Sequence, residues 1–299
     1  MLDKRKIVFW GHTSPLKNTY FYIHMGYEKA ARHLGYETRW LPDEPSQEDF
    51  SNSIIFAETQ EQNHIPICDS SFYVLHNVHG DQVQKYDSVR KQVLNLQVFC
   101  YDTAQWSLEE LAPCVLFSPG MLFQPWATDL LPYEIDANKP GKVFASKVSY
   151  FVGTSGRGEF GNYANLDAFG KAAASKGVEF RTVQGISQEE SIRLIKESYM
   201  APTIVGEWQQ KHGYVPCRIF KNISYGQPGF TNSPIVRELF KNEIVFNENC
   251  SQLFFDARAK FWNISKAEII QQMDYVRDNH TYINRLNTIL SCLERTYNA

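Results

Sequence analysis

The stretch VSYFVGTSGRGEFGNY, residues 148–163, decides how this chain is organised. Its first five residues form a largely apolar run that ends at Gly153, which predicts a strand. A glycine-rich loop, Thr154 to Gly161, follows, and a helical pattern then runs from Tyr163 to Ser175. A strand, a loop and a helix in this order begin an alternating α/β domain with a parallel sheet.

The first half of the chain shows the same alternation. An apolar run, Lys6 to Trp10, ends at Gly11 and is followed by a helical pattern from Gly26 to Leu34. Further runs predict strands at Glu37–Leu41, Ser53–Ala57, Phe72–Leu75, Leu96–Tyr101, Cys114–Phe117 and Leu122–Trp126. We therefore expect a first α/β domain over residues 1–130.

The alternation fails between Trp126 and Lys147, where prolines and mixed charges interrupt it, so we expect a linker over residues 131–147. A second domain, residues 148–265, contains the remaining predicted strands and helices, Val178–Val183, Gln188–Ser198, Pro202–Val205, Gly229–Thr231, Pro234–Phe240 and Glu243–Phe246. A helical pattern over residues 266–299 is expected to pack back on the first domain. Two such domains predict a cleft between them.

Composition excludes some classes of function. The net charge is -3 and the pI is near 6.3, so we expect no nucleic-acid partner, because such proteins need an excess of Lys and Arg. No apolar run approaches the length of about 20 residues that spans a membrane, which leaves at most peripheral membrane contact. The first residues, MLDKRKIVFWGH, do not resemble a signal peptide, and the six cysteines are scattered, so we expect a cytoplasmic protein.

Ligands of open α/β sheets bind where strands end, so the loops after the apolar runs are the places to seek function. The common nucleotide fingerprints are missing from them. GHTSPL follows the first strand where a dinucleotide-binding protein has G-x-G-x-x-G, and no P-loop pattern occurs. The chain also has no Asp-x-Asp motif of the kind that metal-dependent sugar transferases use.

A second informative stretch is HGYVPCRIFKNISYGQPGFTNSP, residues 212–234. Pro216 suits the first turn of a helix and Gly226 suits its carboxyl end. The pattern predicts that Ile219, Phe220 and Ile223 face the core, and that the other face carries Arg218, Lys221, Asn222 and Tyr225.

Two cations in this helix pattern need an explanation. We expect Arg218 and Lys221 to lie near the amino-terminal turns, where the helix dipole favours an anion. They then form a diphosphate site; the alternative is that they are solvated surface charges. The glycine-rich loop with Gly153 and Arg157 lets backbone amides approach a phosphate, or is a flexible surface loop.

Three segments resemble glycosyltransferases of the GT-B fold, of the retaining, family 1/4-like kind. They are RIFKNISYGQPGFTNS (residues 218–233), FVGTSGRGEFGNYANLDAF (151–169) and LFQPWATDLLP (122–132). The resemblance implies two Rossmann-like, doubly wound parallel-sheet domains facing a cleft. It also implies transfer of a sugar from a UDP- or GDP-sugar to a hydroxyl acceptor in a glycan, lipid or small molecule, without a metal or a tightly bound cofactor.

The resemblance also assigns residues. The donor would be bound by Gly153, Arg157, Arg218, Lys221, Asn222, Asn232 and Ser233. In the first domain, His76 and His79 follow a central strand and would contact the donor sugar. An inverting enzyme would need a base, for which His12, His79 and Asp102 are candidates.

One departure from the family concerns the ribose of the donor. Many retaining enzymes of this fold carry two Glu residues seven apart, and Tyr214 and Lys221 occupy those places. Two other functions therefore remain open beside a transferase: a nucleotide-sugar epimerase of the same fold, and a non-catalytic module that binds a sugar nucleotide or a glycan.

Overall fold

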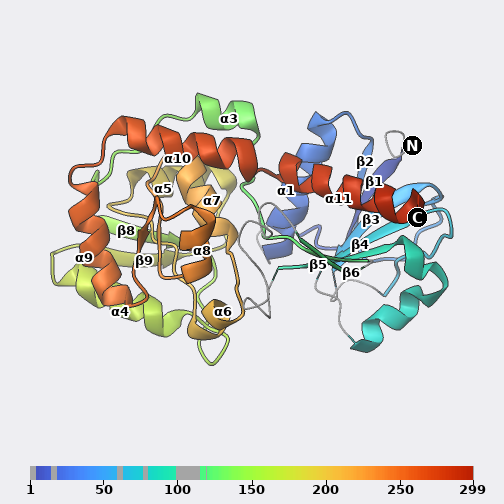
Figure 1. Ribbon diagram of the computed structural model, residues 1–299, viewed down its shortest axis with the longest axis horizontal. Coiled ribbons are helices and arrows are strands. Elements are labelled where there is room, and N and C mark those ends of the chain that lie inside the picture. The colour runs from blue at the N-terminus through green and yellow to red at the C-terminus, as the bar shows by residue number, and fades with distance from the viewer. Residues whose placement is uncertain are drawn as a thin grey trace. The chain divides into compact units, whose positions relative to one another are not determined.

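The computed structural model of the chain describes residues 5–14, 19–58, 63–76, 80–98, 115–118 and 120–298 (Figure 1). These residues divide into two compact units. Unit 1 contains the described parts of residues 1–98, 113–124 and 282–299, and unit 2 contains residues 125–281. None of the helices in the described ranges is long and apolar enough to cross a bilayer.

Unit 1 is built on a seven-stranded sheet in the order β2-β1-β3-β4-β5-β7-β6. Its strands are β1 (Lys6–Trp10), β2 (Thr38–Leu41), β3 (Ser53–Glu58), β4 (Phe72–His76), β5 (Val93–Gln97), β6 (Val115–Ser118) and β7 (Met121–Phe123). All pairings are parallel except that of β6 with β7. The strand order reverses between β1 and β3, and at such a switch point the diverging loops leave a crevice that ligands use.

The central strands of unit 1 are buried on both faces, as continuous apolar runs require. The side chains from Ile7 to Trp10 and from Ile54 to Ala57 are fully buried. Helix α1 (Thr19–His33) packs against α11 (Tyr282–Asn298), and a 3-10 helix, η2 (Gly80–Gln92), leads into β5 (Figure 1). At Gly26 a Cβ atom would lie 2.4 Å from the ring of Tyr282, so only glycine allows α11 to come this close.

Unit 2 contains two short parallel ladders. In one, β8 (Val148–Val152) pairs with β9 (Glu179–Val183), and in the other β10 (Phe230–Thr231) pairs with β11 (Val245–Phe246). A single bridge joins Thr203 to Thr231. The helices are α3 (Pro132–Ala137), α4 (Tyr163–Ala174), α5 (Gln188–Glu197), α6 (Glu207–Lys211), α7 (Cys217–Ser224), α8 (Pro234–Leu239), α9 (Cys250–Phe261) and α10 (Lys266–Asn279).

The core of unit 2 is aromatic. Phe151 of β8, Phe230 of β10, Phe169 of α4 and Phe254 of α9 belong to one buried cluster. The rings of Phe169 and Phe254 meet edge to face with their centroids 5.5 Å apart. This cluster packs both ladders against α4 and α9.

The α/β fold class is confirmed, and four expectations about elements are corrected. Strand β5 begins before the predicted run 96–101, because Val93 to Gln97 are the buried residues. Residues 202–205 form one bridge and no strand. The terminal helix is two helices, broken where Thr128 pairs with Thr281. Helix α9 was missed, although Asn249 caps it by accepting from the backbone N–H of Gln252.

The domain boundaries stay predictions. The residues expected to form a linker, 131–147, include α3 and lie in unit 2. Of the two terminal helices, α10 lies in unit 2 and α11 in unit 1.

Candidate functional site

The switch point of unit 1 holds a histidine paired with a carboxylate. His12 follows β1 and Glu58 ends β3, and the two strands are neighbours in the sheet. His12 Nε2 lies 2.5 Å from Glu58 Oε1, and both residues are buried. A carboxylate that holds an imidazole in this way fixes the orientation of the ring, which is what a positioned general base needs.

The backbone around His12 is in an uncommon conformation. Gly11 has φ 78° and His12 has φ 53°, which places a non-glycine residue in the left-handed region. The indole Nε1 of Trp40 donates to Gly11 O at 2.8 Å, and this bond holds the turn. Strained residues cluster at functional sites, so the turn supports a functional role for His12.

Two further histidines surround the pair. His76 ends β4 and His24 lies on α1, and their rings have centroids 5.9 Å apart. Burial lowers the pKa of His76 to about 3 and, together with His76 and His12, lowers the pKa of His24 well below its ordinary value. Both are therefore neutral at physiological pH. The ring of Tyr20 stacks on His12 with the centroids 5.2 Å apart.

Two of the four site residues that the sequence predicts in unit 1 lie within the described structure. His12 and His76 lie at the carboxyl ends of β1 and β4, as expected. His79 and Asp102 lie outside the described residues. Sequence reasoning missed Glu58, which lies 46 residues from His12. A charged residue ending the apolar run SIIFAE was the signal that pointed to it.

In unit 2, Arg218 occupies the corresponding edge, beside the end of β8. Its Nε donates to Val152 O at 3.0 Å, and its guanidinium carbon lies 3.7 Å from the centre of the Phe151 ring. Burial lowers the pKa of the guanidinium, which nevertheless keeps its charge. Within the described ranges no carboxylate pairs with Arg218.

The position of Arg218 depends on Gly153 and on the start of α7. A Cβ atom at Gly153 would lie 2.2 Å from Arg218 Nη2, so the guanidinium fills the space that glycine leaves. Pro216 is the N-cap of α7, which makes Arg218 its second residue. The amino-terminal end of the helix dipole and the guanidinium together favour an anion.

Lys221 differs from the expectation. It lies in the last turn of α7, where the helix dipole does not favour an anion, so its predicted place near the amino-terminal turns is wrong. Its Nζ lies 3.7 Å from Asp129 Oδ2. Asp129 also accepts from Tyr225 Oη at 2.6 Å and from Gln188 Nε2 at 2.8 Å. Sequence reasoning missed this buried carboxylate, which lies in the segment between β7 and α3.

The predicted faces of α7 are confirmed for its apolar residues, because Ile219, Phe220 and Ile223 are fully buried. They are wrong for Asn222 and Tyr225, which are buried as well. Asn222 Nδ2 donates to Ala201 O at 2.9 Å, and the pKa of Tyr225 is raised well above its ordinary value by burial and by Asp129.

The other donor-binding candidates of unit 2 lie at or near the same edge. Asn232 follows β10, and its side-chain amide makes two bonds of 2.9 Å to the backbone N–H and carbonyl of Val205. Ser233 is fully buried at the start of α8. Arg157 is exposed on the glycine-rich loop, with its guanidinium 4.5 Å from the centre of the Tyr163 ring.

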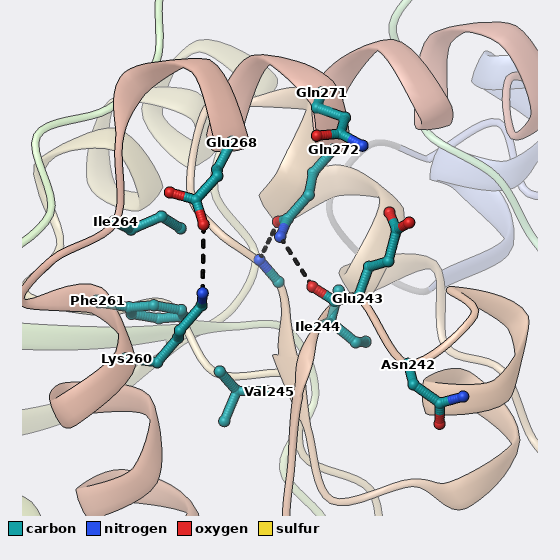
Figure 2. A pocket seen from close by; sticks show the side chains of 11 residues that line it. Asn242, Glu243, Ile244, Val245, Lys260, Phe261, Ile264, Glu268, Gln271 and Gln272 are labelled. Carbon is teal, nitrogen blue, oxygen red and sulfur yellow. Dashed lines mark hydrogen bonds and ion pairs between the residues drawn. The ribbon is translucent and has the colours of Figure 1, made fainter.

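Figure 2 shows a pocket of about 530 Å³ at the other edge of unit 2. Gly229 and Ile244, which immediately precede β10 and β11, belong to its lining. Gln272 bridges these strand starts by accepting from Gly229 N at 2.8 Å and donating to Glu243 O at 3.3 Å. Since ligands of parallel sheets bind at the carboxyl ends of strands, this pocket is not the donor site that we consider.

No protein-family model and no curated protein matches the chain. Solved structures do. An alpha-glucosyltransferase in complex with UDP and a 13-mer DNA containing a HMU base matches 97% of this chain and 100% of its own, with a TM-score of 0.64 at 10% identity. An alpha-glucosyltransferase with UDP and a DNA containing a central A:G mismatch matches 97% of this chain and 99% of its own, with a TM-score of 0.62 at 10% identity.

An alpha,alpha-trehalose 6-phosphate synthase from Burkholderia multivorans matches 98% of this chain and 97% of its own, with a TM-score of 0.50 at 9% identity. At these identities the likeness shows the fold. The chain therefore has the GT-B fold, and the resemblance read from its sequence is confirmed at that level.

Proposed function

We propose that this protein is a glycosyltransferase that moves a sugar from a nucleoside diphosphate sugar to a hydroxyl group. In this proposal unit 2 binds the diphosphate of the donor. UDP is the first nucleotide to test, because the similar alpha-glucosyltransferase structures contain it.

The observation that carries the proposal is the Arg218 guanidinium. It is partly buried between the Phe151 ring and Gly153, and in the described structure it has no carboxylate partner. A cation that is partly shielded from water and has no counter-charge gains from a bound anion. Its place beside the first turn of α7 and a glycine-rich loop suits a phosphate group.

The chemistry needs that charge. The acceptor oxygen forms a bond to the anomeric carbon, the bond from this carbon to the phosphate oxygen breaks, and its electron pair leaves with the nucleoside diphosphate. Arg218 would stabilise the negative charge that develops on this leaving group. With Arg218 in this role, we propose that transfer requires no metal ion.

We propose retention of the anomeric configuration, in keeping with the alpha-glucosyltransferases of similar fold. The acceptor proton then passes to the leaving phosphate oxygen. Inversion would instead require a protein base, and His12 oriented by Glu58 would be that base. Product NMR distinguishes the two outcomes through the coupling constant of the anomeric proton.

The acceptor has two candidate classes. A glycan, lipid or small-molecule hydroxyl follows from the sequence resemblance. A modified base in DNA is the second candidate, because an alpha-glucosyltransferase of similar fold was solved with a DNA that contains a HMU base. This second candidate revises the expectation that nucleic acid has no part, and a 13-mer duplex with and without the HMU base tests it by mass spectrometry.

The central experiment measures UDP affinity by calorimetry for the wild type, Arg218→Ala and Arg218→Lys. We expect a loss of roughly tenfold to hundredfold for the alanine variant and partial recovery with lysine, which keeps the charge but not the planar fork. Lys266→Ala is the control, since it removes an exposed cation from the first turn of another helix. Equal affinity in all four proteins would refute the donor site.

Incubation with UDP-glucose separates the proposal from its rivals. A transferase yields glycosylated acceptor and slow donor hydrolysis, an epimerase yields an isomeric donor without any acceptor, and a binding module yields neither. Activity that EDTA abolishes and Mn²⁺ restores would contradict metal independence.

A further inference from the structure

A group of aromatic rings, of which Phe160 is the exposed one, lies on α6 and on the loop that starts beside Arg218. Phe160 is 63% exposed at the end of the glycine-rich loop, and its ring meets that of Trp208 on α6 edge to face, with centroids 4.9 Å apart. The ring of His212 stacks on Trp208 with centroids 4.0 Å apart. Large exposed apolar groups that gather in one place mark a binding surface.

Close backbone packing fixes this aromatic group in place. A Cβ atom at Gly206 would lie 2.1 Å from Gly161 O, so the loop before α4 and the loop before α6 touch through their main chains. The same glycine-rich loop begins at Gly153, against the guanidinium of Arg218. One loop therefore carries the anion-binding contact at its start and an exposed ring, Phe160, at its end.

The polar groups at this strand end are already used within the protein. The backbone N–H and carbonyl of Val205 bond to the side chain of Asn232, and Gly206 N donates to Gln209 Oε1 at 2.9 Å. Gln210 Nε2 donates to Asn232 O at 2.6 Å. These polar groups of Val205, Gly206, Gln210 and Asn232 are thus already paired, whereas Phe160 is exposed.

The residues of the two loops and α6 carry balanced charges. Arg157 and Lys211 are matched by Glu159 and Glu207, and a further cation, Arg218 of α7, is the residue that the proposed function assigns to the diphosphate. A neutral surface of this kind suits a neutral planar ring and does not suit a polyanion such as a nucleic-acid strand, which needs a cationic groove.

We propose that Phe160 and Trp208 bind the nucleobase of the donor by stacking, and that the site accepts pyrimidine and purine nucleoside diphosphates with similar affinity. The proposal rests on the proposed function, because it places the base beside the diphosphate at Arg218. Tolerance follows from the chemistry, since every base has a ring face, whereas selection among bases requires hydrogen bonds to their edges.

Calorimetry on the full chain tests this with UDP, GDP, ADP and inorganic pyrophosphate. The variants are Phe160→Ala, Phe160→Tyr and Trp208→Ala, and the control is Tyr133→Ala, which removes an aromatic side chain that is 58% exposed on α3. Phe160 is exposed, so its replacement leaves the fold intact even if Trp208→Ala destabilises it.

We expect the wild type to bind the three nucleotides within about fivefold of one another. Phe160→Ala should weaken all three by roughly tenfold or more, leave pyrophosphate affinity unchanged, and be rescued by Phe160→Tyr. UDP affinity that is unchanged in Phe160→Ala and Trp208→Ala but lost in Arg218→Ala would overturn the stacking inference while the donor site stands. UDP binding a hundredfold tighter than GDP and ADP would overturn the tolerance. Failure of every nucleotide to bind would overturn the proposed function itself.

Discussion

Replacing Gly153 with alanine should remove the Arg218 guanidinium from its place without deleting it. The added Cβ atom would lie 2.2 Å from Nη2, far below contact distance, and 3.1 Å from the guanidinium carbon, which is also tight. The atoms in its way belong to the end of a flexible side chain, so the guanidinium moves and the backbone of α7 stays. The bond to Val152 O and the packing on Phe151 are then lost.

The magnitude follows from the contact that is displaced. A hydrogen bond from a charged donor is worth about 1.5–3 kcal/mol, so UDP affinity should fall roughly tenfold to hundredfold in Gly153→Ala. The backbone adds a separate cost, because φ at this position is 140°, a conformation that costs a non-glycine residue about 1–3 kcal/mol of stability. That cost applies to folding, and calorimetric UDP titration of the folded protein reports the displaced contact.

Gly158→Ala is the matched control. Gly158 lies in the same loop with φ 83°, and a Cβ atom there would meet nothing within 4 Å. It should lower stability in the same way and leave UDP affinity unchanged. The double variant Gly153→Ala/Arg218→Ala should bind UDP as Arg218→Ala alone does, because the first substitution acts through Arg218. Wild-type affinity in Gly153→Ala, or additive losses in the double variant, would refute the reasoning.

Three further predictions concern other parts of the chain. The pKa of His76 is about 3 in the folded protein and near 6.5 in the unfolded chain, so its contribution to the free energy of unfolding is complete above pH 6.5 and falls as the pH drops toward 3. Urea unfolding should therefore give a smaller free energy at pH 5 than at pH 7, and His76→Asn should reduce this difference. Gly26→Ala should destabilise unit 1 by about 1–3 kcal/mol through its clash with Tyr282, measured as a lower thermal midpoint, and an unchanged midpoint would contradict the close packing. Lys221→Ala should weaken UDP binding less than Arg218→Ala does in the same titration, and the reverse order would be evidence against our ranking of the two cations.

The sequence predicts elements well where one apolar run makes one strand. The runs at residues 6–10 and 148–152 coincide with β1 and β8 residue for residue. Prediction fails where distant residues decide the structure. The predicted terminal helix is broken by the pairing of Thr281 with Thr128. The residues near Thr281 contain no pattern that predicts pairing with a residue so distant in the sequence.

The candidate site residues divide in the same way, into those that local sequence predicts and those that depend on distant residues. Residues that directly follow strands, such as His12 and Gly153, can be found from the pattern alone, because strand ends place them at one edge of a sheet. The residues that they or their neighbours pair with cannot be found in this way. Glu58 reaches His12 because β1 and β3 are neighbours in the sheet, and Asp129 reaches Tyr225 over a separation of 96 residues. Only the strand order and the packing of α7 bring such pairs together.

The packing of α7 also explains why its two cations are not equivalent. The charge of Lys221 is partly matched by Asp129, whose carboxylate is fixed by bonds from Tyr225 and Gln188, whereas the guanidinium of Arg218 meets an aromatic ring and a backbone carbonyl. A phosphate that approached Lys221 would compete with a carboxylate already in place, while one that approached Arg218 would supply its first anionic contact within the described structure. An anion at this edge therefore gains more from Arg218, and we place the diphosphate at the start of α7 instead of at its end.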